Sequence, residues 1–485
     1  MTKKLCLLLA AALLSACASP PELDNYEQRS VSIENTATPD VSFVETTDAQ
    51  WWRAFDDETL TTLIEYGTQN NLDIVIASYR MEEARSQAYQ AGASLLPRFG
   101  GGVEAQRQRT SSNRIGAFPG ETPFTDWNYQ AGFDASWELD LFGRNQATLD
   151  AAEAQALASA QQLDATRLTI ASEIARLYIE ILANNERLSI ASQRESDLFK
   201  LQLITQKRVD LGDIGKASLQ QVNASYASAK ATTAALKAGV ERQIYALSVL
   251  TGRSPAELPN QFTSLSALKT PAPEIAFSLT SLRQRPDVLA AEMVVVATAA
   301  QLKAAEAQLY PRLVLQANGG FQSASTPNLF DVNSITGVFG PQINIPIFEG
   351  GAIRAQIRAA SASSSQALAE FDRTLLNAAL EVHDGLARFQ GTKQQGIHLK
   401  EAYEQSKQAY LAVQRAYSLG AENLVSVLQN RQQVFEAKEL WVNAQTELNL
   451  SLVALYKATA GAPLDSDRAT NESSRTTSTL ENINE

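Results

Sequence analysis

Few residues in this chain have side chains that could carry out chemistry, and they are not grouped. The 485 residues include two cysteines, Cys6 and Cys17, and two histidines, His383 and His398. Both histidines lie in strongly helical sequence, so we interpret them as solvated or packed helix residues rather than ligands. The sequence has no Cys/His cluster, no glycine-rich loop followed by Lys-Ser/Thr and no G-x-S-x-G motif. The sequence therefore offers no residues that could catalyse a reaction, and no catalytic site, metal or cofactor is expected.

Cys17 is the one reactive residue that stands in a recognisable context. Lys3 and Lys4 precede an apolar run, Leu5 to Leu14, and small residues lead from it into the cysteine. This order predicts a secretory signal peptide, residues 1–16, cleaved before Cys17. The junction is similar to the bacterial lipobox, in which the thiol receives a diacylglycerol and the freed amine a third acyl chain, and these anchor the protein to a membrane.

An ordinary signal peptide with a chance cysteine is the alternative. Ala18 follows where lipoproteins of the inner membrane usually carry Asp, which favours the outer membrane. Residues 17–50 would then form a lipidated N-terminal segment. Because Cys6 leaves with the signal, the mature chain has no disulfide.

Charge and hydropathy exclude two further classes of protein. The formal net charge of −12 argues against nucleic acid as a partner. After the signal, no run approaches the eighteen apolar residues that a membrane helix needs. If the protein crosses a membrane, we expect it to do so with strands.

The chain contains two copies of one plan. Leu95-Leu96-Pro97-Arg98 recurs as Leu309-Tyr310-Pro311-Arg312, and Leu211-Gly212 recurs as Leu419-Gly420. Phe142-Gly143, just before a long helix, recurs as Phe348-Glu349-Gly350-Gly351. Each half predicts helix, strand, strand, long helix, long helix. An internal duplication accounts for this, with residues 51–255 as the first repeat and 284–463 as the second.

The clearest strand runs from Trp127 to Leu141, where apolar and polar residues alternate. An alternation of period two places one set of side chains on each face of a strand. Aromatic residues near both ends of the apolar row are typical of a strand tilted across a bilayer. A strand of a soluble sandwich would alternate in the same way, but rarely over this length. The expected lipid-facing residues are Trp127, Tyr129, Phe133 and Trp137.

Three further strands are expected. The partner of the first runs from Arg98 to about Thr110, and a loop rich in Ser, Gly and Pro turns the chain round. The second copy has strands at Leu313 to Phe321 and Ile335 to Ile347. Pro341 and Pro346 lack a backbone N–H, so we expect a bend or a loosened end there.

Two long helices follow each pair of strands. Asn145 to about Asp210 has neither proline nor glycine, and would form a rod of about 100 Å. The returning helix has heptad rows that begin at Leu219 and Val222, and the second half repeats them from Val427 and Asn430. Such rows predict closely packed helix pairs. A soluble coiled coil would show the same local pattern.

Four antiparallel strands cannot close a barrel, and an open sheet edge cannot lie in lipid. Three chains of four strands would give twelve, enough for a water-filled lumen. We therefore predict an α+β membrane protein: a homotrimeric twelve-stranded outer-membrane β-barrel with four strands per chain, continued by a long α-helical tunnel in the periplasm. Conduction is the function that follows from this architecture.

The order of these motifs resembles the TolC-type outer-membrane efflux proteins, and more narrowly the lipoprotein branch that serves resistance-nodulation-division pumps. The resemblance rests on the lipobox, the segment Trp51-Trp52-Arg53-Ala54-Phe55, the Pro-Arg and Phe-Gly junctions, Arg285-Pro286-Asp287 and the paired Leu-Gly turns. It covers roughly residues 49–463. It implies a homotrimer in contact with outer-membrane lipid, with a periplasmic adapter protein and an inner-membrane pump of that class as partners.

The resemblance also implies roles for the connecting segments. Residues 256–283 would link the repeats in an equatorial belt, together with the N-terminal segment. The tail, residues 464–485, is rich in Ser, Thr, Asn and Glu and is expected to be disordered.

In that family the two Leu-Gly turns lie at the periplasmic tip, where adapter hairpins dock. This implies docking at Leu211, Gly212, Leu419 and Gly420. Glycine suits such a turn because the helix ends in a left-handed conformation. Two helix caps without a docking role are the alternative.

The family narrows its tip with carboxylates a few residues past each turn. The corresponding constriction positions here are Ser218, Ser426 and Gln429, and none of them is acidic. An acidic ring at the tip is therefore not expected, although Asp210, Asp213 and Glu422 lie near the turns.

Two other functions compete with an efflux channel. A periplasmic coiled-coil lipoprotein that spaces the envelope would conduct nothing, but it has no use for an apolar row such as that around Phe133. A duct of the same fold for secreted polypeptides would keep the architecture and change the cargo. The lipobox favours the efflux branch.

Overall fold

The computed structural model describes residues 50–109, 111, 122, 125–258, 262, 264–271 and 282–459, which belong to one unit, Phe43–Glu485. The predicted signal peptide, Cys17 with nearly all of the lipidated segment, and the tail 464–485 lie outside the described residues. Between the halves, only parts of the predicted linker are described.

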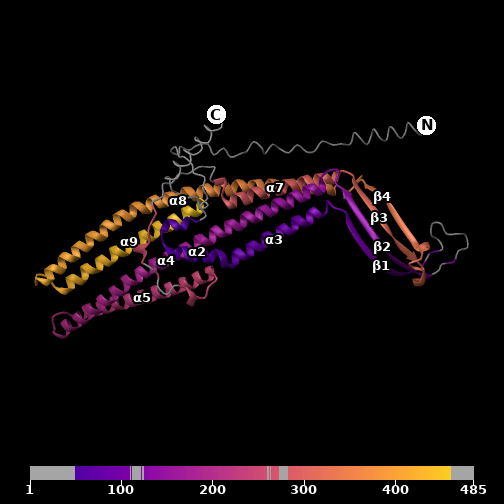
Figure 1. The fold of residues 1–485 in the computed structure, drawn as a ribbon. Coiled ribbons are helices and arrows are strands. Elements are labelled where there is room, and N and C mark those ends of the chain that lie inside the picture. The colour runs from indigo at the N-terminus through magenta and orange to yellow at the C-terminus, as the bar shows by residue number, and fades with distance from the viewer. Residues whose placement is uncertain are drawn as a thin grey trace, which may run out of the picture. The chain divides into compact units, whose positions relative to one another are not determined.

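Both halves contain the elements that the repeat predicts (Figure 1). The first half consists of η2 (Trp51–Phe55), α2 (Glu58–Asn70), α3 (Leu72–Ala93), β1 (Arg98–Arg109), β2 (Thr125–Leu139), α4 (Arg144–Asp210) and α5 (Lys216–Thr251). The short helices η3 (Pro255–Glu257) and η4 (Leu265–Ala267) follow. The second half consists of α7 (Pro286–Glu306), η5 (Ala307–Leu309), β3 (Arg312–Ser323), η6 (Thr326–Asn328), η7 (Val332–Ser334), β4 (Ile335–Asn344), α8 (Ala352–Ser418) and α9 (Leu424–Ala458).

The four strands form one antiparallel sheet in the order β1-β2-β3-β4, so that β2 and β3 join the two halves. The boundaries of β2, β3 and β4 differ from the sequence prediction by a few residues, and two of these differences have a clear physical reason. β4 ends at Asn344 rather than Ile347, because Pro346 cannot donate to the ladder. β2 ends at Leu139 rather than Leu141, where the Leu141 amide donates to the Leu139 carbonyl and the chain turns toward α4.

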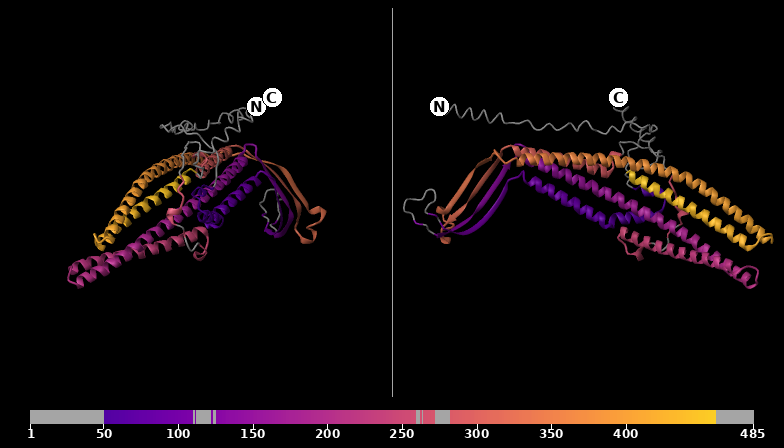
Figure 2. Two further views of the ribbon diagram at one scale, coloured as in Figure 1. Left: turned by 60° about the vertical axis from the view of Figure 1, so that its left-hand side comes forward. Right: turned by 180° about the vertical axis from the view of Figure 1, so that it is seen from behind.

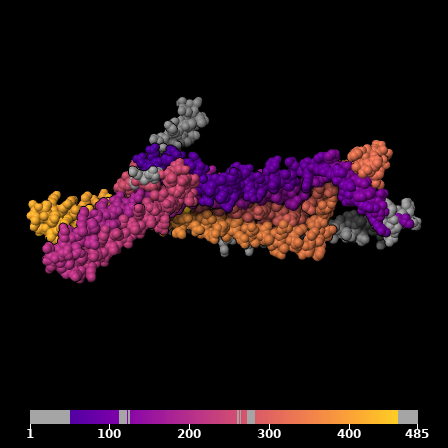
Figure 3. All heavy atoms as spheres, turned by 90° about the horizontal axis from the view of Figure 1, so that it is seen from below, coloured from indigo at the N-terminus to yellow at the C-terminus, as the bar shows by residue number. Residues whose placement is uncertain are grey.

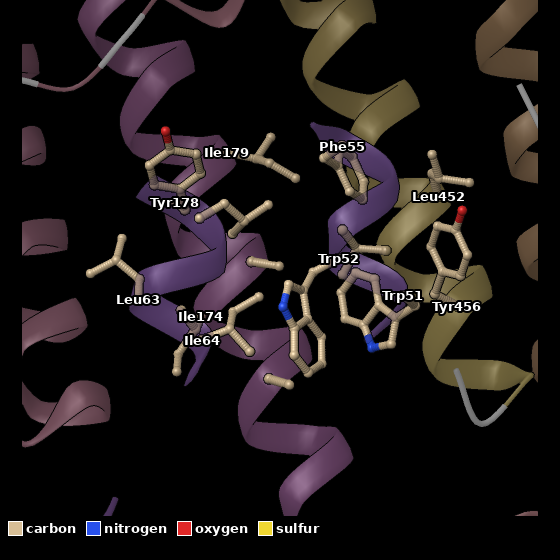
Figure 4. Packing of buried hydrophobic residues seen from close by; sticks show 14 of the residues in the cluster. Trp51, Trp52, Phe55, Leu63, Ile64, Ile174, Tyr178, Ile179, Leu452 and Tyr456 are labelled. Carbon is tan, nitrogen blue, oxygen red and sulfur yellow. The ribbon is translucent and has the colours of Figure 1, made fainter. Parts of the chain in front are cut away.

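Part of the hydrophobic core lies where η2 and α2 meet the middle of α4 and the end of α9 (Figure 4). The Trp51 ring stacks on Tyr456 with ring centroids 5.2 Å apart, and Phe55 is fully buried beside it. The Tyr178 hydroxyl donates to Asp57 Oδ2 at 2.9 Å, while Asp57 Oδ1 accepts the Leu60 amide and caps α2. The Trp51–Phe55 segment is thus an anchor that joins both repeats.

The predicted heptad rows lie along the contacts between neighbouring helices. In α5, every residue of the two rows from Leu219 to Leu250 is buried or half-buried, and most residues between them are exposed. α5 packs along α4, and α9 packs along both α8 and α4. Because it has two neighbours, α9 has an additional buried stripe, which consists of Leu428, Phe435, Val442, Asn449 and Tyr456.

An equivalent clasp closes each of the two repeats, which supports the inferred duplication. Asn71 caps α3 with its Oδ1 atom and donates through Nδ2 to the Leu250 carbonyl at the end of α5, at 2.8 Å. At the start of α7, the buried Arg285 donates through Nη1 to the Ala458 carbonyl at the end of α9, at 3.0 Å. Arg285 also forms ion pairs with Asp287 and Glu381, both at 2.7 Å. The sequence did not predict the break at Asn71 that separates α2 from α3.

One statement of the sequence analysis needs correction. The segment Pro286–Leu309 is long and apolar enough to cross a membrane by length and composition alone. In the structure it packs lengthwise against α4 and α8, and it lies among the other helices (Figure 2). It is a wall helix that buries Val288, Ala290, Ala297 and Ala305 against its neighbours, while Val296 stays exposed in the single chain.

Candidate functional sites on the sheet and at the helix turns

The two faces of the sheet differ in polarity along all four strands. The registers place Phe133 opposite both Gly101 and Gly319, and Ala317 opposite Phe339. The odd-numbered residues of all four strands therefore share one face, and the even-numbered residues share the other. The apolar face consists mainly of Phe99, Val103, Trp127, Tyr129, Ala131, Phe133, Ala135, Trp137, Leu139, Leu313, Leu315, Ala317, Phe321, Ile335, Phe339 and Ile343. The polar face carries Arg98, Glu104, Gln106, Gln108, Asp126, Asn128, Gln130, Asp134, Glu138, Arg312, Gln316, Asn318, Gln322, Gln342 and Asn344. The four predicted lipid-facing residues therefore share one continuous apolar face.

Two glycines show in which direction the sheet curves. Gly132 and Gly320 are paired on the polar face. A Cβ atom at Gly320 would lie 2.4 Å from the Ala131 carbonyl oxygen, whereas a Cβ atom at Gly319, on the apolar face, would meet nothing within 4 Å. At this pair the two backbones are crowded on the polar side, so the sheet bends toward the polar face there. The polar face is therefore concave at the centre of β2 and β3, as the inside of a barrel requires.

Aromatic residues lie near both ends of the apolar face, where they contact neighbouring groups. The Trp127 ring stacks on Tyr129 with centroids 5.7 Å apart near the loop end of β2. At the other end, Trp137 donates through Nε1 to the Leu95 carbonyl at 2.9 Å. Between them, the ring of Phe133 lies against Gly101 and stacks on Phe99.

The two Leu-Gly turns have the same geometry, and both lie at the helix ends remote from the sheet (Figures 1 and 3). Gly212 and Gly420 both have φ +76°. Gly212 donates to Val209 and Asp213 to Arg208; Gly420 donates to Tyr417 and Ala421 to Ala416. These are the paired bonds of a Schellman cap, which needs a left-handed residue.

Each turn presents a leucine beside a glycine with open space around it. The side chains of Leu211 and Leu419 are 83% and 84% exposed, and a Cβ atom at Gly212 or Gly420 would meet nothing within 4 Å. Folding therefore requires the left-handed backbone at the glycines but not the exposed leucines.

The three constriction positions lie in or near the first turns of the returning helices. Ser218 and Gln429 are exposed, and Ser426 is half-buried with its amide bonded to the cap Asn423 at 3.0 Å. Of the carboxylates nearby, Asp213 is paired with Arg208 at 2.6 Å. Asp210 accepts a hydrogen bond from Gln206 at 2.8 Å.

Comparison with known families decides the classification. The outer membrane efflux protein family matches residues 63–253 and 279–461, most of the chain and both repeats. The chain belongs to this family. Its members and the structural neighbours are channel proteins of the outer membrane, and the chain accordingly is an outer-membrane protein.

Relatives within the family match over almost their whole length. The pyoverdine export outer membrane protein OpmQ of Pseudomonas putida is 28% identical over 466 residues, which cover 95% of this chain and 98% of OpmQ. The outer membrane protein OprJ of Pseudomonas aeruginosa is 28% identical over 94% of this chain and 95% of its own. The crystal structure of the outer membrane protein VceC of Vibrio cholerae superposes with a TM-score of 0.76 at 26% identity, and covers 87% of this chain and all of VceC.

The structural neighbours of this family member are trimeric channels, so the predicted fold class is confirmed: a homotrimeric barrel with four strands per chain, continued by helices. None of the comparisons assigns roles to the individual residues of the sheet faces or the turns. Those roles remain predictions.

A polar seam between α4 and α9 was not predicted from the sequence. Glu186 pairs with Lys438 at 2.6 Å, and Arg187 donates to Asn443 at 2.8 Å. Nearer the turns, the fully buried Asp197 pairs with Arg431 at 2.9 Å. The heptad pattern identifies contacts within each helix pair, whereas this seam joins the two pairs. No single-helix periodicity reveals which polar residues of distant segments will meet.

Glu186 should make the seam sensitive to acid. Burial raises the pKa of Glu186, but the hydrogen bonds from Lys438 and Ser264 and the charge of Lys438 together lower it by more. The net pKa therefore lies below its usual value. A carboxylate with a lowered folded-state pKa stabilises the fold above its unfolded pKa, about 4, and loses that contribution as the pH falls through the folded value. Glu186→Gln should therefore lower the free energy of unfolding by about 1–3 kcal/mol at pH 7, with a much smaller difference near pH 3.

Denaturant unfolding of both proteins at the two pH values measures this. The matched control is Glu404→Gln, which removes an exposed carboxylate from a pair with Lys407 at 4.0 Å, and should change stability by less than about 1 kcal/mol at either pH. A difference for Glu186→Gln that is equal at both pH values would contradict the assigned linkage.

Proposed function

We propose that this protein is the outer-membrane channel of a tripartite efflux system, and that it conducts small molecules from a periplasmic adapter and an inner-membrane pump to the exterior. The observation that carries the proposal is the curved sheet, polar on its concave face and apolar on its convex face, joined to helices of 67 residues. A polar concave face can line water, and an apolar convex face can contact lipid.

The free edges of the sheet support the trimeric arrangement. Within one chain β1 and β4 each have one paired edge among the described strands. An unpaired edge in lipid would leave several backbone groups without hydrogen bonds. In the trimer, β1 of one subunit is expected to pair with β4 of the next, which leaves no edge exposed.

The helix turns are the proposed docking sites for the adapter. Two equivalent turns with exposed Leu211 and Leu419 lie at one end of the molecule, away from the sheet. Apolar side chains that the fold does not use for packing suit contacts with another protein. Relatives are named as outer-membrane components of efflux pumps, which supports an adapter and a resistance-nodulation-division pump as partners.

Deletion of the gene tests the function. Cells without the protein should accumulate more of the exported compounds, and plasmid-borne protein should restore export and co-purify with an adapter. Normal export by the deletion strain across toxic solvents, antibiotics and siderophores would exclude the efflux channel. Loss of a secreted polypeptide instead would establish the alternative duct. An intact trimer that forms no conductance in planar bilayers would favour the envelope spacer.

Cys17 is the proposed site of lipid attachment. Cys17→Ala should abolish incorporation of labelled palmitate, because the thiol receives the diacylglycerol and the freed amine of the same residue receives the third acyl chain. The trimer should still reach the outer membrane if another signal-peptidase site is supplied, since the barrel provides its own membrane anchorage. Gel autoradiography measures the label. Continued labelling of Cys17→Ala would contradict the assignment of Cys17 as the lipid attachment site. Absence of label from the unaltered protein would show that the junction is an ordinary signal peptide.

The constriction should respond weakly to divalent cations. Ser218, Ser426 and Gln429 have no charge, and Asp213 is neutralised by Arg208 within the same turn. Millimolar divalent cations added on the periplasmic side should therefore leave most of the single-channel conductance. Introducing carboxylates, with Ser426→Asp and Gln429→Asp, should make the channel sensitive to the same cations. Strong block of the unaltered channel would mean that Asp210, Asp213 or Glu422 forms an acidic ring.

A further inference from the structure

The apolar face of the sheet contains two charged residues among its described strand positions, Arg107 and Arg109. Both belong to the last part of β1, and they lie opposite Trp127 and Thr125. The other charged residues of the four strands, such as Arg98 and Arg312, belong to the polar face. The positive charge on this face is therefore concentrated at one corner of the sheet.

The position of this corner along the membrane normal follows from the strand geometry. Six residues separate Phe133 from Trp127, which is about 20 Å along the strand and about 15 Å along the normal for a strand tilted by about 40°. Half of the hydrocarbon core is about 15 Å thick. With Phe133 at the centre of the bilayer, Arg107 lies at the boundary of the hydrocarbon and Arg109 lies among the headgroups.

The corner belongs to the outer leaflet. The long helices leave the sheet at the opposite end (Figure 1), which in the proposed arrangement is the periplasmic side. At the corner itself, the Arg107 guanidinium lies over the Trp127 ring, 6.0 Å from its centroid. A guanidinium held over an aromatic face keeps its N–H groups at the edge for anionic oxygens.

We propose that Arg107 and Arg109, with the platform of Trp127 and Tyr129, bind the phosphate of a phosphorylated glycolipid in the outer leaflet, one site per subunit. The occupant follows from charge and depth: two arginines beside stacked aromatics at headgroup level match a lipid phosphate above acyl chains. The proposal rests on the assignment of the apolar face to lipid.

Lipid titration of the delipidated, detergent-solubilised full-length trimer tests the site. Native mass spectrometry counts bound bis-phosphorylated lipid A, and the same lipid without phosphate serves as the second probe. Arg107→Gln with Arg109→Gln should weaken binding of the phosphorylated lipid by about tenfold or more, which is the effect expected when a charge-assisted hydrogen bond is lost. The dephosphorylated lipid should bind both proteins equally weakly.

The matched control removes two arginines from the polar face of the same sheet, Arg98→Gln with Arg312→Gln, and should leave lipid affinity unchanged. Arg107→Lys with Arg109→Lys keeps the charge but not the planar guanidinium, so its affinity should lie between those of the glutamine variant and the unaltered protein. Excess inorganic phosphate should not displace the lipid; displacement would indicate a site for free phosphate and overturn the assignment.

Three further results overturn the proposal: equal affinity of the altered and unaltered proteins, equal binding of the dephosphorylated lipid, or dissociation of the glutamine variant into monomers, which would make the arginines a subunit contact. Conductance measurements on the same preparations distinguish failure of the lipid site from failure of the channel assignment. Failure of the lipid site alone would leave conductance intact, whereas failure of the channel would abolish it in every preparation.

Discussion

Gly420→Trp should abolish export while leaving a folded trimer in the outer membrane. Gly420 has φ +76° and open space around its Cα atom, so a large side chain would project from the turn rather than into the fold. The strain of a left-handed non-glycine residue is about 1–2 kcal/mol, which we expect the folded trimer to tolerate. The indole would occupy the surface that we propose for the adapter.

The measurement compares efflux, trimer content and adapter co-purification. Gly420→Ala is the matched control, because it introduces the same backbone strain with little bulk, and it should keep most of the export. Gly212→Trp tests the equivalent turn and should also impair docking. Normal export by Gly420→Trp, with the adapter still bound, would show that the turn is a helix cap without a docking role.

Phe133→Arg should prevent most of the protein from assembling in the outer membrane. Phe133 lies near the middle of β2 on the apolar face. An arginine on the lipid side at mid-bilayer costs about 2–4 kcal/mol per subunit, and a trimer contains three copies. The amount of heat-modifiable trimer in purified outer membranes, measured on semi-native gels, reports the effect.

Asp134→Arg is the control next to it in the sequence. Asp134 lies on the polar face, where water can solvate an arginine, so the loss of trimer should be small. The two variants introduce the same side chain one residue apart, so local β-propensity cannot explain a difference between them. Equal assembly of both would mean that the apolar face does not contact lipid.

Patterns that repeat along a single segment made much of this fold predictable. The alternation around Phe133 predicted a strand and its two faces, because a strand has a side-chain period of two. The heptads from Leu219 predicted the α4–α5 seam. The recurrence of Leu211-Gly212 as Leu419-Gly420 predicted two equivalent turns, and the shared φ of the glycines is consistent with it.

Features that depend on how distant segments meet could not be predicted. The Asp197–Arg431 pair joins two helices whose partners no local pattern specifies. The curvature at Gly320 depends on the approach of the β2 backbone, 188 residues earlier at Gly132. The apolar stretch from Pro286 also needed the structure, because composition alone does not distinguish a wall helix from a membrane span.

The two clasps of the repeats have a consequence for the symmetry of the assembly. Asn71 closes the first repeat with a neutral amide, whereas Arg285 closes the second with a guanidinium that also pairs with Asp287 and Glu381. Burial raises the pKa of Asp287, but the hydrogen bond and charge of Arg285 lower it to a net value below the usual one. Six clasps around a trimer would therefore alternate between acid-resistant and acid-sensitive, so that strong acid would loosen every second one. The six repeats of a trimer have similar helices, but acid would weaken the clasps of only three. The tunnel would therefore lose stability with threefold rather than sixfold symmetry.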